Sequence, residues 1–253
     1  MGRMLIEAAL QQPDAQVVAA FDRADSPVSG RDCAEFLGRS VGVEVRADMS
    51  ALKDADVLID FTRPEATLKH LQACTASGVN MVIGTTGLDD AAKKAINAAA
   101  ERIAIVFSPN MGVGVNAVFK LLDVAARILS DGFDVEIIET HHRHKVDAPS
   151  GTALKMGEVI AEARGTKLDR VAVYAREGIV GERGPETIGF SSIRGGDVIG
   201  DHIVLFAGTG ERVEIAHKAS NRMTYAIGSM RAARFLQGKR RGLYDMSDVL
   251  GLK

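Results

Sequence analysis

The densest group of side chains able to do chemistry lies in residues 139–153, which read Glu-Thr-His-His-Arg-His-Lys-Val-Asp-Ala-Pro-Ser-Gly-Thr-Ala. Three histidines and a lysine fall within five positions of this stretch. A histidine holds a proton near neutral pH and can deliver it to a reacting carbon or nitrogen, and the positive charge of Lys145 strengthens the binding of an anion. The stretch therefore predicts an acid-catalysed step on an anionic substrate.

A helix start follows this group. Ser150 is a residue type that caps helices, so the next helix is expected to open with Gly151 and Thr152. The backbone N–H groups at a helix start and the helix dipole favour a bound carboxylate. An acid, a cation and an anion-binding helix end thus lie close together in the sequence.

Two alternatives remain open for the histidines. His141, His142 and His144 could form a metal site, but such a site would need further carboxylate or thiolate ligands at fitting spacing, and the charges of Arg143 and Lys145 would repel a cation. A purely structural histidine cluster is the second alternative.

A second set of candidate residues lies nearer the amino terminus. Asp22 and Arg23 follow an apolar run, where a dinucleotide-binding fold uses an acidic residue for the adenosine ribose and an arginine for a 2′-phosphate. Loops of small residues at 84–87 and 108–112 follow further predicted strands, where open α/β sheets bind ligands. The alternatives are a solvated charged turn and two tight turns.

The elements that must position these residues follow a βαβ rhythm in the first half of the chain. Strands are predicted at residues 17–21, 56–61, 80–83 and 103–107, and helices at residues 4–12, 65–77 and 89–102. This alternation is typical of a doubly wound parallel sheet.

The rhythm changes after a long helix predicted at residues 115–130. Strands are then predicted at residues 134–140, 187–193, 202–207 and 211–217, a loop or exposed insertion at 163–184, and a helix at 222–237. We therefore predict an α/β protein with a Rossmann-like dinucleotide-binding domain at residues 1–112 and 222–253 and an α+β domain with a mixed sheet at residues 113–221.

Composition narrows the function classes. The formal net charge of −2 argues against a nucleic-acid partner. Cys33 and Cys74 form no CxxC pair, so neither a disulfide framework nor a thiolate zinc site is indicated, and a cytoplasmic location is expected. No apolar run has the roughly 18 residues that span a bilayer, so no membrane partner is expected.

The motifs together resemble the dihydrodipicolinate reductase family. Residues 139–153 resemble that family's pattern E-x-H-H-x-x-K-x-D-x-P-S-G-T-A, and further family-like motifs occur in the family's order at residues 60–64, 84–87, 110–116 and 217–220. The resemblance covers essentially the whole chain. It implies NADH- or NADPH-dependent reduction of 4-hydroxy-tetrahydrodipicolinate, a dicarboxylate, in the diaminopimelate route to lysine, by a homotetramer built through the central domain.

The resemblance also implies roles for individual residues. His141 would be the proton donor and Lys145 its catalytic partner. The substrate carboxylates would bind to His142, Gly151 and Thr152. The cofactor would bind to Met1, Asp22, Arg23, Gly84, Thr85, Thr86, Ser108, Pro109, Asn110 and Met111, and no metal is implied.

One departure from the family pattern concerns the start. The family opens with a strand and a loop of the form G-x-x-G-R-M-G-R, whereas this sequence begins at the final Met1-Gly2-Arg3. An upstream segment encoding the strand and loop is therefore expected. Two rival functions remain at this stage, a metal-dependent hydrolase using the histidines and a nucleotide-sensing protein without catalytic activity.

Overall fold

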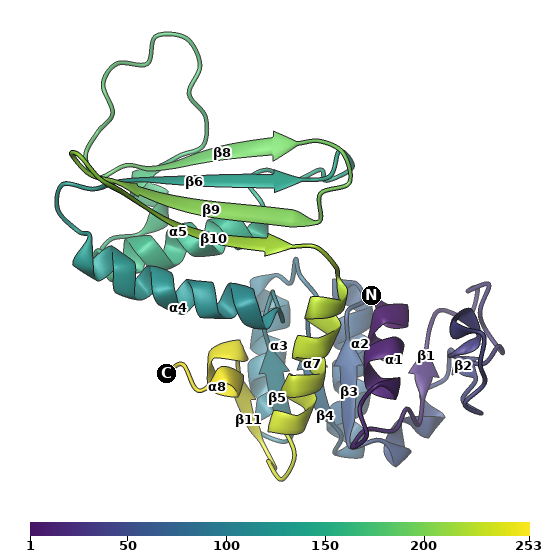
Figure 1. Ribbon diagram of the computed structural model, residues 1–253. Helices are drawn as coiled ribbons and strands as arrows, with labels where there is room; N and C mark the ends of the chain where they lie inside the picture. Colours follow the sequence, from purple (N-terminus) through teal and green to yellow (C-terminus); the bar gives the residue numbers. More distant parts are fainter. The chain divides into compact units, whose positions relative to one another are not determined.

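The computed structural model describes all 253 residues, which divide into two compact units (Figure 1). Unit 1 comprises Met1–Val113 and Arg222–Lys253, and unit 2 comprises Gly114–Asn221. No helix combines the length and the apolar composition needed to cross a membrane.

Unit 1 contains a parallel sheet with helices on both faces. Its helices are α1 (Gly2–Leu10), α2 (Pro64–Ser77), α3 (Asp90–Ala100), α7 (Met223–Phe235) and α8 (Met246–Leu250). Its strands are β1 (Ala20–Phe21), β2 (Val45–Arg46), β3 (Val57–Asp60), β4 (Asn80–Ile83), β5 (Ala104–Phe107) and β11 (Gly242–Tyr244), and two short 3-10 helices cover Glu35–Leu37 and Ser50–Asp54.

The main sheet of unit 1 has the strand order β11-β5-β4-β3, with every pair parallel, and β1 and β2 form a separate parallel pair. Alternate residues of the central strands pack against different helices. Met81 and Ile83 of β4 lie in a core shared with α2 and α3, whereas Val82 lies in a core shared with α7 and α8. Burial on both faces explains why these strands read as continuous apolar runs.

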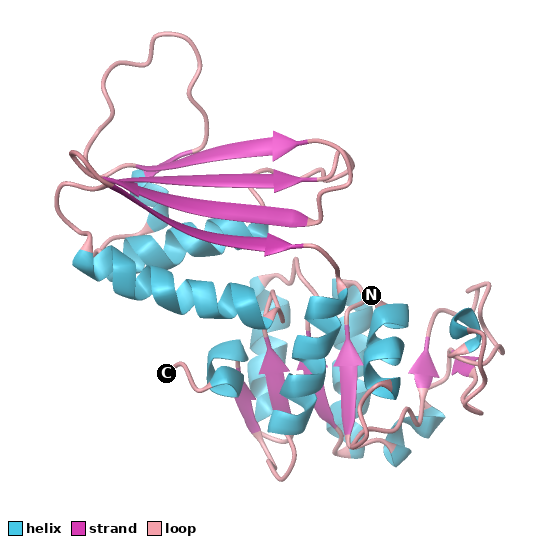
Figure 2. Ribbon diagram, viewed as in Figure 1, coloured by secondary structure: helices cyan, strands magenta, loops and turns pink.

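Unit 2 contains a mixed sheet with its helices on one face (Figure 2). Its helices are α4, which begins at the unit boundary (Val113–Ile128), α5 (Gly151–Ala163) and α6 (Leu168–Val171). Its strands are β6 (Asp134–His141), β7 (Ala172–Val173), β8 (Ile188–Arg194), β9 (Gly200–Ala207) and β10 (Arg212–Ala219).

The strand order of this sheet is β10-β9-β6-β8-β7. The pairs β10/β9 and β9/β6 are antiparallel, and the pairs β6/β8 and β8/β7 are parallel. Strand β6 alternates strictly between buried and half-buried residues, and its buried side chains pack with α4 and α5. The register of β6 therefore decides which side chains face the helices.

The predicted α/β class and mixed second sheet are confirmed, and two local predictions are wrong. The strand predicted at residues 17–21 is only the two-residue β1, because it pairs with β2 alone. The segment 163–184, predicted as loop, contains α6 and β7. Strand β7 forms because two residues join the edge of β8, a long-range pairing that local composition does not indicate.

Candidate active site

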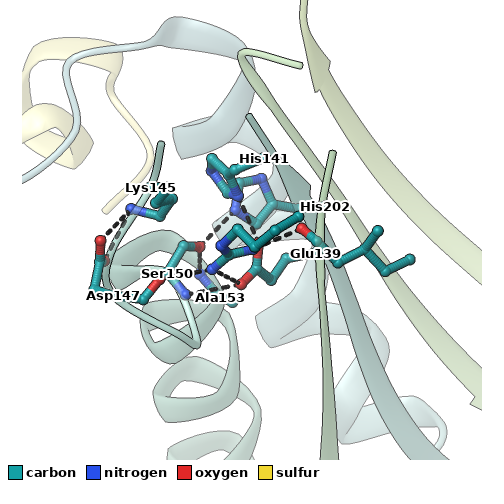
Figure 3. A network of polar contacts seen from close by, with 9 residues as sticks. Glu139, His141, Lys145, Asp147, Ser150, Ala153 and His202 are labelled. Atoms are coloured by element: carbon teal, nitrogen blue, oxygen red, sulfur yellow. Dashed lines mark hydrogen bonds and ion pairs between the residues drawn. The ribbon is translucent and has the colours of Figure 1, made fainter. Parts of the chain in front are cut away.

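Strand β6 places two chemically active side chains on the helix-covered face of the unit 2 sheet. Glu139 and His141 are two residues apart, so their side chains point to the same face. Glu139 is 1% exposed and His141 is 8% exposed. Nδ1 of His141 lies 2.5 Å from Oε2 of Glu139 (Figure 3).

Glu139 is held as a carboxylate in spite of its burial. Burial opposes its ionisation, but hydrogen bonds from Arg194, Ser192 and His141 outweigh that effect and lower the pKa of Glu139 to about 2. An ionised carboxylate can only accept hydrogen bonds, so Nδ1 of His141 carries a hydrogen. Nε2 of His141 is therefore the atom that takes up and releases a proton.

His141 loses its proton at a lower pH than an exposed histidine does. Burial lowers the pKa of His141, and Glu139 opposes that shift. Lys145 and Arg194 add to the lowering because they are positively charged. A histidine tuned in this way releases its proton readily, as a general acid must.

Lys145 lies in the loop after β6 and forms an ion pair there. Its Nζ atom donates to both carboxylate oxygens of Asp147 at 2.8 Å (Figure 3). The side chain of Lys145 is 19% exposed. Burial raises the pKa of Asp147, but the hydrogen bond and charge of Lys145, a backbone hydrogen bond and the charge of Arg194 together outweigh it, so the net pKa is lowered and the pair is ionic.

Ser150 caps helix α5, as predicted. Its Oγ atom accepts a hydrogen bond from the N–H of Ala153 at 3.1 Å and lies 2.8 Å from Nε2 of His202 (Figure 3). Gly151 and Thr152 are the first two residues of the helix. The structure therefore puts both predicted anion-binding residues at a helix N-terminus, in the same unit as His141.

The other two histidines of the motif, His142 and His144, have surroundings that differ from those of His141. His142 is half-buried and His144 is exposed, and their rings lie 6.2 Å apart at a tilt of 38°. His141 instead contacts His202 of β9, with ring centroids 5.1 Å apart. No three His, Cys, Asp or Glu side chains are arranged to hold a metal ion, so the geometry gives the metal alternative no support.

In unit 1, the two predicted loops follow neighbouring parallel strands. Gly84, Thr85 and Thr86 follow β4, and residues 108–111, which include Pro109, follow β5. The N–H of Ser108 donates to the carbonyl of Ile83 at 3.1 Å, which joins the loop after β5 to the end of β4.

The side chains of these loops differ in accessibility. Thr85 is buried and accepts a hydrogen bond from Thr67, and Met111 is fully buried in the core. The hydroxyl of Ser108 donates to the carbonyl of Asn110. Because its side chain is buried, Met111 can line a ligand site only with its backbone.

The residues predicted to meet the adenosine ribose follow β1. The carboxylate of Asp22 accepts hydrogen bonds from the N–H of Arg23 and from the hydroxyl of Ser26, both at 2.8 Å. Its oxygens have further lone pairs for ribose hydroxyls. The side chain of Arg23 is 75% exposed, and Met1 precedes α1 as its N-cap. An exposed carboxylate and guanidinium beside a parallel sheet fit a dinucleotide.

Three further residues of the site had no predicted role. Glu139 was part of the motif, but its position beside His141 follows only from the alternation of β6. Arg194 and His202 lie 55 and 63 residues beyond Glu139, and strand pairing brings them together. Burial lowers the pKa of His202 to about 3, so this histidine is neutral. The sequence offered a signal only for Glu139, namely the two-residue alternation of a strand over residues 134–141. It offered none for Arg194 or His202.

Gly228 of α7 fixes the position of the loop after β5. A Cβ atom at this glycine would lie 1.8 Å from the carbonyl oxygen of Met111. Gly228→Ala is therefore expected to destabilise the protein by about 1–3 kcal/mol, the usual range for overpacking. Urea unfolding measures this change. Gly2→Ala is the control because a Cβ atom there meets nothing within 4 Å, and equal stability of both variants would contradict the close approach.

Comparison with known proteins places these features in one family. The family model described as "Dihydrodipicolinate reductase, N-terminus" matches residues 1–111, and the one described as "Dihydrodipicolinate reductase, C-terminus" matches residues 114–250. The 4-hydroxy-tetrahydrodipicolinate reductases of Chromobacterium violaceum and Herminiimonas arsenicoxydans are 63% and 62% identical, over 100% of this chain and 95% of each relative.

Solved structures agree with this placement. A dipicolinate-bound dihydrodipicolinate reductase from Paenisporosarcina sp. TG-14 superposes with a TM-score of 0.74 and 26% identity, over 98% of this chain and 94% of that one. GenD2 from gentamicin A biosynthesis, in complex with NAD, shares the fold with a TM-score of 0.61 at 13% identity, over 100% and 88% of the two chains. With both family models matched end to end, the chain belongs to the dihydrodipicolinate reductase family.

Proposed function

We propose that this protein reduces 4-hydroxy-tetrahydrodipicolinate to tetrahydrodipicolinate with NADH or NADPH, in the diaminopimelate route to lysine. The observation that carries the proposal is the Glu139–His141 pair beside the N-terminus of α5, which combines a proton donor with a carboxylate-binding helix end. The two relatives described above, both named 4-hydroxy-tetrahydrodipicolinate reductase, are more than 60% identical over the whole chain.

The residues of unit 2 perform the acid and binding steps of this reaction. A bound nicotinamide cofactor would supply a hydride. Loss of the 4-hydroxyl group of the substrate as water would leave a conjugated imine, and hydride addition to this imine would build negative charge that the proton on Nε2 of His141 would quench by forming a C–H bond. Lys145 supports that step and binds the substrate. His142 and the N–H groups of Gly151 and Thr152 bind the two carboxylates.

The decisive assay uses freshly made 4-hydroxy-tetrahydrodipicolinate and follows the loss of NAD(P)H absorbance. The purified protein is expected to oxidise either cofactor only when the substrate is present. Absence of turnover with both cofactors, in a protein that melts cooperatively, would exclude the proposed reaction.

Both cofactors are expected to bind through unit 1. Asp22 suits the free ribose of NADH, and Arg23 suits the 2′-phosphate of NADPH. Gly84, Thr85, Thr86 and the segment from Ser108 to Met111 line the nicotinamide side in this proposal, and Met1 lies at the pyrophosphate side.

Arg23→Ala is expected to weaken NADPH binding roughly 1.4–5-fold at low ionic strength, since exposed ion pairs contribute about 0.2–1 kcal/mol. Fluorescence titration measures the dissociation constants of both cofactors, and that of NADH should stay unchanged. Arg31→Ala is the control, because Arg31 is also an exposed arginine but is paired with Glu35. Unchanged NADPH affinity of the Arg23→Ala variant would argue against the phosphate contact.

We also propose a cytoplasmic homotetramer. The uncovered face of the unit 2 sheet carries Ile138 and Ile203, which are paired across β6 and β9, and the half-exposed Ile193 of β8. Such an apolar sheet face favours association with further copies. The free thiols of Cys33 and Cys74 are consistent with a reducing compartment. Light scattering of the purified protein tests the tetramer.

A further inference from the structure

Each carboxylate oxygen of Glu139 joins one active-site group to Arg194. Oε2 accepts from Nδ1 of His141 at 2.5 Å and from Nη1 of Arg194 at 2.8 Å. Oε1 accepts from the N–H of Ser150 at 3.2 Å and from Nη2 of Arg194 at 2.7 Å. The two-pronged guanidinium therefore fixes the plane of the carboxylate and, through it, both the imidazole and the helix start.

Arg194 also holds the loop that carries Lys145. Its Nη2 atom donates to the backbone carbonyl of Asp147 at 2.6 Å, and Asp147 is the ion-pair partner of Lys145. Parallel pairing of β6 with β8 sets Arg194 directly opposite His141 in the register. The guanidinium of Arg194 thus contacts Glu139, which holds His141 and the start of α5, and also the loop that carries Lys145.

We propose that Arg194 is a positioning residue for this reaction, which through Glu139 holds the proton donor His141 and the N-terminus of helix α5 in one fixed arrangement. The inference rests on the proposed function for the identity of the reaction. It goes beyond that function because the proposed function gives Arg194 no role, whereas its guanidinium donates to both oxygens of Glu139 and to the carbonyl of Asp147.

The charge of Arg194 has a second consequence. Glu139 is almost fully buried, and Arg194 neutralises it. The charged or titratable groups facing His141 are Glu139 on β6, Arg194 on β8, Lys145 in the following loop and His202 on β9. Without Arg194, His141 would be the remaining ion-pair partner of the Glu139 carboxylate. The unbalanced negative charge would favour the imidazolium form of His141 and raise its pKa.

The test compares Arg194→Gln with Arg194→Lys and with Arg176→Gln. Arg176 makes the same two-pronged contact, at 2.9 Å for both bonds, with Glu136 of the same strand, and Glu136 keeps Arg183 as a second partner. Arg176→Gln thus removes a matching pair that does not involve Glu139 or His141. Thermal melts of all variants establish that they are folded.

Two readouts are measured on each variant. Histidine NMR titration follows the pKa of His141 without any substrate, and the pH profile of kcat/KM follows the limb on which activity falls as His141 loses its proton. In Arg194→Gln, we expect both to move to higher pH and kcat/KM at neutral pH to fall about 10–100-fold. Arg194→Lys keeps the positive charge but loses the two-pronged contact with Glu139. Its pH profile should therefore stay near wild type while its kcat/KM falls. Arg176→Gln should change neither readout.

The outcomes separate this inference from the proposed function. A wild-type protein that does not turn over substrate would contradict the proposed function, while the NMR titration would still report on Arg194. An active wild type whose Arg194→Gln variant keeps the His141 titration and the pH profile would overturn the inference. Equal losses in Arg194→Gln and Arg176→Gln would overturn it as well, because a general effect on the sheet would then explain both. If Arg194→Gln does not fold, a wild-type rate in Arg194→Lys overturns the inference and a reduced rate at an unshifted pH profile supports it.

Discussion

His141→Gln is expected to lower kcat by about 10²–10⁴-fold, the usual contribution of general acid catalysis. Glutamine fills a similar space and its amide can still donate a hydrogen bond to Glu139, but an amide is far too weak an acid to transfer a proton. Affinity for NADH and NADPH should be nearly unchanged, because the residues proposed to bind the cofactor all belong to unit 1. Steady-state kinetics gives kcat, and fluorescence titration of NADH gives the dissociation constant.

His144→Gln is the matched control for this variant. His144 belongs to the same motif but is exposed and has no contact with Glu139. Its substitution should leave kcat at the wild-type value. Wild-type turnover by the His141→Gln enzyme would remove His141 as the proton donor.

The pH dependence of wild-type activity follows from the same pair. His141 must be protonated to act as an acid, so kcat/KM should fall as pH rises through its pKa. Burial lowers that pKa relative to a free histidine, so the fall should begin at a lower pH than it would for an exposed histidine. Glu139, with a pKa of about 2, stays ionised throughout this range and does not contribute to the profile.

The sequence predicted those parts of the fold in which local pattern and tertiary burial agree. The strand at residues 80–83 is a continuous apolar run, and it occurs at those residues because helices cover both of its faces. The helix after Ser150 was predicted from a capping residue, and the cap is present. In each case the local signal and the packing in the folded chain coincide.

Other elements depend on partners far away in the sequence. Strand β11 has three residues and exists because it pairs with β5, whose paired residues lie 138 positions earlier. Strand β7 and the two-residue β1 are likewise defined by their partners. No periodicity can be read from two or three residues, so such strands are invisible to a pattern-based prediction.

The residues of the site also divide into those with a local sequence signal and those placed by long-range strand pairing. His141, Lys145, Gly151 and Thr152 occur in one motif, and unit 2 holds all of them around the end of β6 and the start of α5. Arg194 and His202 reach the site only through the registers of β8 and β9 against β6. Sequence reasoning could thus identify the chemistry but not the groups that hold it in place.

Lys145→Ala is expected to lower kcat/KM by about 10–150-fold, the equivalent of about 1.5–3 kcal/mol for a hydrogen bond to a charged group. The side chain of Lys145 is 19% exposed and its ammonium group is held by Asp147, so water only partly screens its attraction for a dicarboxylate. Because Lys145 supports both binding and proton supply, KM should rise and kcat should fall. Varying the ionic strength adds a check, since salt should raise KM of the wild type more than KM of Lys145→Ala. Lys155→Ala serves as the control because Lys155 forms only an exposed pair with Glu158 on α5. A Lys145→Ala enzyme with wild-type KM and an unchanged response to salt would show that the substrate carboxylates are bound without Lys145.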